Sequence, residues 1–81
     1  LQPPLSPNQF ALLAVLYDNA GRIVDRDAIV AHVWGPGEEV SDQTIDALVS
    51  RLRKRLAETD PGHEYIITRR GFGLMFQNRK P

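Results

Sequence analysis

Apolar residues in the first third of the chain repeat at helical spacing. The predicted core face of this first helix comprises Phe10, Leu13 and Tyr17, with Leu12 and Leu16 beside them. Ser6 is a favourable N-cap, Pro7 suits the first helical position, and Gln9 completes a capping box. Gly21 is a natural stop beyond the C-terminus. The pattern therefore predicts a helix over about residues 7–19.

A second and shorter helix is predicted to begin at Asp25, a good N-cap. Its apolar positions are Ile29, Val30 and Val33, and the run Gly35-Pro36-Gly37 ends it. The segment 22–24 between the two helices is short and is predicted to form a single extended bridge.

The third predicted helix follows Ser41 and ends before Asp60-Pro61-Gly62. Its buried stripe consists of Ile45, Val49, Leu52 and Leu56. At 100° per residue, the opposite side carries Ala47, Ser50, Arg51 and Lys54. The helix thus combines an apolar face with a face of small and cationic residues.

The end of the chain predicts a β-hairpin over residues 64–77. Residues 64–69 are rich in β-forming side chains, Arg70-Gly71 can reverse the chain, and residues 72–76 return. A two-stranded hairpin is marginal alone, so Ile66 and Phe76 are expected to pack on the helices. The predicted class is α+β: a three-helix core with a C-terminal β-hairpin, in one domain spanning residues 1–81.

Charge is balanced over the whole chain but not along it. Lysine and arginine total ten, as do aspartate and glutamate. Residues 1–46 carry two cations against seven anions, and residues 47–81 carry eight cations against three anions. This asymmetry favours a molecule with one basic face, although a short chain also reaches such a split by coincidence.

Several functional classes find no support in the sequence. No nucleophile motif, glycine-rich phosphate loop or paired-carboxylate pattern is present, so an enzyme is not expected. Cysteine is absent, and His32 and His63 stand too far apart for a credible metal pair, so neither a metal nor another cofactor is expected. No apolar run approaches the roughly 20 residues of a membrane span. The predicted setting is cytoplasmic.

The cations of the third helix and of the hairpin turn suit a nucleic acid. Arg51 can form paired hydrogen bonds to a guanine edge in the major groove, and small neighbours such as Ala47 permit close approach. A second set can meet phosphates or the minor groove: Gln43 and Thr44 in the first turn, Arg53 and Lys54 on the helix, and Arg69 and Arg70 at the hairpin tip. The alternative is a solvated basic helix end, favoured by the helix dipole.

The order helix, helix, helix, hairpin is that of a winged helix-turn-helix, and the sequence resembles the DNA-binding effector domain of the OmpR/PhoB family of bacterial response regulators. The resemblance covers roughly 70 positions in order. The residues that carry it are Leu5–Leu13, Gly21–Val24, Val33–Gly35, Val40–Asp46, Ser50–Leu56 and Thr68–Gly73.

The resemblance implies roles for individual residues. It implies that helix 41–58 enters the major groove, that Ala47 and Arg51 read bases, and that Arg70 lies in the minor groove. The implied phosphate contacts are Trp34, Gln43, Thr44, Leu48, Ser50 and Arg53. The loop Gly35, Pro36, Gly37, Glu38 and Glu39 corresponds to one that touches RNA polymerase; a solvated acidic linker is the preferred alternative. For Trp34, packing against the core or the helix end is the preferred alternative.

The resemblance also implies two copies on tandem half-sites of double-stranded DNA, in transcription regulation by a two-component phosphorelay. Residues 1–5 correspond to a remnant of an N-terminal strand or linker and 77–81 to a tail; the receiver domain has no counterpart here. Gln43, Leu48, Ser50 and Leu74 depart from the family pattern. The rival prediction is a winged-helix protein-interaction module without DNA binding. It is motivated by the neutral net charge, by Gln43 and Ser50, which stand where the family often has cations, and by Leu48, which is expected to be exposed.

Overall fold

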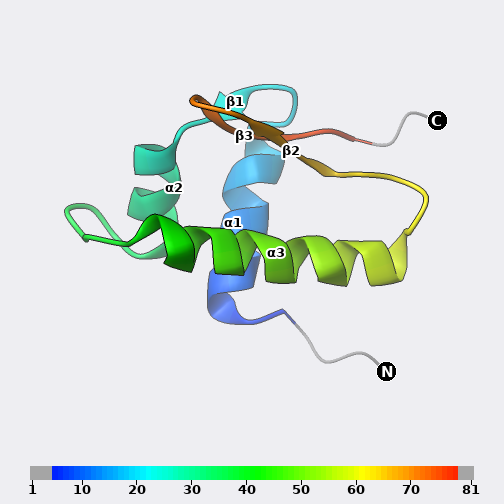
Figure 1. Ribbon diagram of the computed structural model, residues 1–81, viewed down its shortest axis with the longest axis horizontal. Coiled ribbons are helices and arrows are strands. Elements are labelled where there is room, and N and C mark those ends of the chain that lie inside the picture. Colours follow the sequence, from blue (N-terminus) through cyan, green and yellow to red (C-terminus); the bar gives the residue numbers. More distant parts are fainter. Residues whose placement is uncertain (1–4, 79–81) are drawn as a thin grey trace.

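The fold of residues 5–78, as described by a computed structural model, is three helices and a small sheet (Figure 1). The helices are α1 (Pro7–Asp18), α2 (Arg26–Val33) and α3 (Asp42–Thr59). The strands are β1 (Ile23–Val24), β2 (Ile66–Arg69) and β3 (Gly73–Phe76). The proposed strand remnant at 1–5 and the tail at 77–81 fall outside the described residues, except for Leu5, Gln77 and Asn78.

Each helix begins at the cap that the sequence predicts. The Ser6 hydroxyl accepts from the Gln9 backbone N–H, and the Gln9 side chain accepts from the Ser6 N–H at 2.9 Å, which completes the capping box. Asp25 caps α2 through the Ala28 N–H, and Ser41 caps α3 through the Thr44 N–H. These contacts satisfy N–H groups that a helix leaves without an internal partner.

The buried face of α1 differs from the predicted one. Leu12, Val15 and Leu16 are buried, whereas Phe10 is 64% exposed and Tyr17 is 59% exposed. Tyr17 keeps an edge-to-face contact with the Phe76 ring, with centroids 5.5 Å apart. Because apolar residues surround most of α1, periodicity alone does not determine which of its stripes faces the core.

The sheet has three antiparallel strands in the order β1-β3-β2. The predicted hairpin is confirmed as β2 and β3, and a third strand joins it. The predicted bridge at 22–24 supplies β1, which pairs Ile23 with Met75 and Val24 with Leu74. Phe72 lies in the turn and is 70% exposed, although the returning strand was predicted to begin there. β3 begins instead at Gly73, whose φ is +144° and where a Cβ atom would overlap the Val24 carbonyl.

One core joins all the elements. Val24, Leu74, Phe76 and Ile66 project from the sheet onto the helices, and Leu52 of α3 is fully buried. Figure 1 shows α1 crossing behind α3, with the sheet above both helices. The predicted stripe of α3 is largely confirmed, because Ile45, Val49 and Leu52 are buried and Leu56 packs partly against them. The arrangement leaves one long side of α3 facing solvent.

Candidate nucleic-acid interface

The solvent side of α3 carries the cations that the sequence assigned to it. Ser50, Arg51 and Lys54 are exposed, and Ala47 is half-buried beside them. Gln43 and Thr44 are exposed in the first turn, where the Thr44 hydroxyl lies 2.9 Å from the Ser41 hydroxyl. The surface is therefore a cationic patch with small side chains at its centre.

Leu48 does not belong to that surface. Its side chain is 6% exposed and lies in the core with Val49 and Leu52. The expectation of an exposed Leu48 was wrong, because its position lies next to the buried stripe on a helix with a wide apolar face. This residue stands where the family resemblance implies a phosphate contact, and its side chain is instead packed inside.

The tip of the β2–β3 wing presents a second group of cations. Arg69 and Arg70 are exposed, and the Phe72 N–H donates to the Arg69 carbonyl at 2.8 Å to close the turn. Gly71 has a φ of +83°, the left-handed conformation that such a turn requires and that glycine adopts without steric cost. The turn therefore holds two guanidinium groups at the end of the sheet.

A surface hollow connects the wing tip to the start of α3. Its polar lining comprises Arg26, Asp42 and Asp46 from the helices and Thr68, Arg69 and Arg70 from the wing. Figure 1 shows the orange wing tip above the N-terminal part of α3. The structure thus brings the wing arginines to the end of α3 where Gln43 and Thr44 lie, and it places two carboxylates among them.

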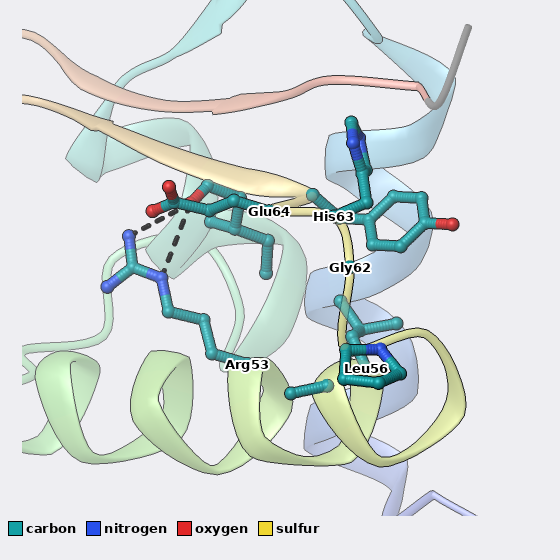
Figure 2. A pocket seen from close by; sticks show the side chains of 9 residues that line it. Arg53, Leu56, Gly62, His63 and Glu64 are labelled. Carbon is teal, nitrogen blue, oxygen red and sulfur yellow. Dashed lines mark hydrogen bonds between the residues drawn. The ribbon is translucent and has the colours of Figure 1, made fainter.

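Arg53 has a different environment from the exposed Arg51 and Lys54. It is half-buried, and its Nε and Nη2 atoms lie 3.3 and 3.1 Å from the Ile66 carbonyl oxygen. Nη2 also lies 2.6 Å from the Thr68 hydroxyl oxygen. Figure 2 shows the guanidinium extending from α3 towards β2. The side chain joins the third helix to the wing, and its contact with a phosphate stays a prediction.

Arg26 forms a corresponding link at the N-terminal end of α3, which sequence reasoning missed. Its Nε donates to Asp42 at 2.6 Å, and its Nη2 donates to the Val40 carbonyl. Asp42 also stands in the first turn of α3, where a carboxylate suits the helix dipole. Because Arg26 and Asp42 lie sixteen positions apart, no local pattern signals the pair. The link fixes the start of α3 against α2.

The C-terminal end of α2 carries Trp34, and the loop 35–39 follows it. Trp34 is the C-cap residue; its backbone N–H donates to the Val30 carbonyl, and its side chain packs partly against the core, as the preferred alternative predicts. Pro36, Gly37, Glu38 and Glu39 are exposed, and Gly35 is half-buried. The loop is accessible, and its contact with a polymerase stays a prediction.

His63 has partners at the open end of the sheet. His63 lies 2.8 Å from the Gln77 carbonyl and packs edge-on against Tyr65, whose hydroxyl donates to Asp60 at 2.7 Å. Within residues 5–78, no group of three or more histidine or acidic side chains is arranged to hold a metal ion. Across the same residues, no helix combines the length and the apolar character needed to cross a bilayer.

Known proteins resemble the chain over nearly its full length. A probable transcriptional regulator, ycf27, of Cyanophora paradoxa is 36% identical over 76 residues, which cover 91% of this chain and 32% of the relative. The chain therefore spans about a third of the length of the curated relatives it matches.

Two solved structures share the fold. The DNA-binding domain of RstA from Klebsiella pneumoniae, solved in complex with the RstA box, is 35% identical with a TM-score of 0.75; the match covers 91% of this chain and 73% of that one. The DNA-binding domain of CpxR from E. coli is 32% identical with a TM-score of 0.76, covering 90% and 72%.

The family described as "Transcriptional regulatory protein, C terminal" matches residues 2–76. With its three helices, three-stranded sheet and hairpin wing, the chain is a winged-helix domain and belongs to this family of OmpR/PhoB-type C-terminal domains.

Proposed function

We propose that the chain binds double-stranded DNA sequence-specifically, with α3 in the major groove and the β2–β3 wing over the adjacent minor groove. The observation that carries the proposal is the exposure of cations on two elements that meet at one hollow: Arg51 and Lys54 on α3, and Arg69 and Arg70 on the wing. A polyanion that follows both elements would neutralise all four charges.

Each exposed residue has a role that its chemistry suits. Arg51 reads a base edge, since a guanidinium can form two hydrogen bonds to a guanine, and Ala47 beside it permits the approach. Arg70 enters the minor groove, where the negative potential is concentrated. The phosphate contacts fall to Gln43, Thr44, Ser50, Lys54 and Arg69, with the Trp34 indole N–H as a further donor.

The start of α3 offers a neutral rather than a cationic phosphate site. Gln43 and Ser50 carry no charge, and Asp42 and Asp46 lie close to the wing arginines. Few counterions are then released on binding, so the logarithm of affinity should fall only gently with the logarithm of salt concentration. Base contacts would therefore supply a large share of the specific affinity.

The relatives indicate the setting of this activity. RstA's DNA-binding domain was solved with its DNA box, and ycf27 is described as a probable transcriptional regulator. By analogy, this chain is the effector part of a bacterial-type response regulator, acts in the cytoplasm, and binds as two copies on tandem half-sites. The exposed loop at 35–39 would then face RNA polymerase.

The test compares two neighbouring cations on the selected target duplex. Oligonucleotides bound from a random pool define the target. Arg51→Ala should weaken binding to it by about 1–3 kcal/mol and relax the preference at one base pair. Lys54→Ala should weaken all duplexes alike and reduce the salt slope by about one. Equal binding by wild type and both variants would show that this face of α3 does not contact DNA.

The rival function, a protein-interaction module, has lost one of its supports, since Leu48 is buried. Neutral net charge and the missing cations at Gln43 and Ser50 still motivate it. Titration into random-sequence duplex at low and at moderate salt separates the two. Association that weakens with salt supports DNA binding, whereas no association even at low salt favours the interaction module.

A further inference from the structure

β2 is an edge strand, and its outer edge needs hydrogen-bond partners from outside the sheet. In the order β1-β3-β2 it pairs only with β3, with Ile66 opposite Phe76. The neighbouring pair on the side away from the turn, Tyr65 and Gln77, is hydrogen-bonded, because the Gln77 N–H donates to the Tyr65 carbonyl at 2.7 Å. Alternation in an antiparallel ladder then directs the Ile66 carbonyl away from β3, towards α3.

Arg53 satisfies this carbonyl. Its Nε and Nη2 lie 3.3 and 3.1 Å from the Ile66 oxygen, and Nη2 extends to the Thr68 hydroxyl at 2.6 Å. Ile66 itself is 1% exposed, so its carbonyl has little access to water as a substitute partner. One guanidinium therefore binds two alternate residues of β2 from the middle of α3. Figure 2 shows the two bonds from Arg53 to the Ile66 carbonyl.

We propose that Arg53 is a positioning residue, which fixes the wing relative to α3 so that Arg70 reaches the duplex that α3 reads. It acts through Arg70 and not as a phosphate contact. This inference rests on the proposed DNA binding. The bonds to Ile66 and Thr68 lie four and two residues before Arg70 along the chain, so loss of the link lets the tip of the wing tilt relative to α3.

Lysine cannot replace Arg53 in this role although it keeps the charge. A guanidinium presents donors in a fixed planar fork, and here Nε and Nη2 converge on one oxygen. An ammonium is a single point on a flexible stem and offers no such fork. Arg53→Lys therefore separates the two possible roles, because a phosphate contact requires charge and the positioning role requires shape.

The DNA test is a double-mutant cycle measured by fluorescence anisotropy on the selected target. Arg53→Lys, Arg53→Ala and Arg70→Ala should each reduce affinity by a similar factor, on the order of tenfold. The double variant Arg53→Lys/Arg70→Ala should bind within about twofold of either single variant, since positioning has no value once Arg70 is absent. Lys54→Ala is the matched control. In the double variant Lys54→Ala/Arg70→Ala, the fold-losses in affinity of the two single variants should multiply.

The opposite pattern would overturn the proposal. A phosphate contact predicts that Arg53→Lys binds like wild type, that Arg53→Ala lowers the salt slope by about one, and that both effects multiply with Arg70→Ala. Variants are compared only where circular dichroism shows them folded. If Arg53→Lys or Arg53→Ala is unfolded, Arg53→Gln, which keeps two N–H donors, takes its place.

Amide hydrogen exchange tests the positioning without DNA. Arg53→Lys should speed exchange at the β2–β3 amides of Ile67, Arg69 and Phe72 relative to wild type, with α1 amides unchanged. Unchanged wing exchange would contradict the proposal. If wild type fails to bind any duplex, the proposed function fails, and the exchange experiment still decides whether Arg53 fixes the wing.

Discussion

The base and the tip of the β2–β3 wing are built in opposite ways. At the base, Ile66 and Phe76 are buried, and Arg53 bonds the Ile66 carbonyl from α3. At the tip, Arg70 and Phe72 are exposed, and the turn is closed by its own backbone hydrogen bond. The base carries the stability of the wing, which leaves the tip residues available for contact with another molecule.

The same division separates two arginines on α3. Arg51 and Arg53 are two positions apart, which places them about 200° apart around the helix. Arg51 faces solvent, whereas Arg53 faces β2 and bonds to it. Two arginines in one basic run therefore have different roles, and the surroundings of each side chain determine its role.

The largest expected effect lies at Gly73, which pairs with Arg69 beside the turn and lies against the backbone of Val24. A Cβ there would overlap the Val24 carbonyl at a φ of +144°, so Gly73→Ala should cost about 4 kcal/mol or more through strain and displacement of β1. Gly71→Ala, at the tip, meets nothing within 4 Å and should cost about 1–2 kcal/mol for its φ of +83°. Urea unfolding measures both, and equal losses would contradict the contrast between the packed Gly73 and the open turn position Gly71.

The next effect distinguishes the two faces of β2. Ile66→Ala removes a side chain that is 1% exposed and should cost about 2–4 kcal/mol in the free energy of unfolding. Ile67→Ala, on the opposite face of the same strand and only half-buried, should cost about 1 kcal/mol. A reversed order would mean that the sheet packs on the helices with its other face.

The smallest effect concerns the arginines themselves. Arg53→Ala leaves the Ile66 carbonyl without its donor and should destabilise the fold by about 1–2 kcal/mol. Arg70→Ala, at the exposed tip, should change stability by less than about 0.5 kcal/mol. Thermal unfolding monitored by circular dichroism compares them. Similar stability losses for both variants would remove the distinction between structural and exposed cations.

The sequence predicts what depends on local chemistry. The caps Ser6, Asp25 and Ser41 and the turn glycine Gly71 each perform a local task that neighbouring residues reveal. The three helices follow from those caps and from apolar spacing.

What the sequence missed depends on partners distant along the chain. The third strand needs Ile23 opposite Met75, and the burial of Leu48 and exposure of Phe10 depend on how the helices cross. For the site, the sequence located the cations but did not distinguish Arg53 from Arg51. Only the position of Ile66, thirteen residues further along the chain, shows that Arg53 is engaged inside the molecule.

The central claim is that α3 and the wing tip contact the same DNA duplex. The most direct test is ¹⁵N-resolved NMR of the domain titrated with random-sequence duplex at low salt. The expected result is salt-sensitive shift changes at Thr44, Ala47, Arg51 and Lys54 and at Arg69 to Phe72, with Phe10 and Tyr17 of α1 unchanged. Shift changes confined to α1, or none at all at low salt, would contradict the claim.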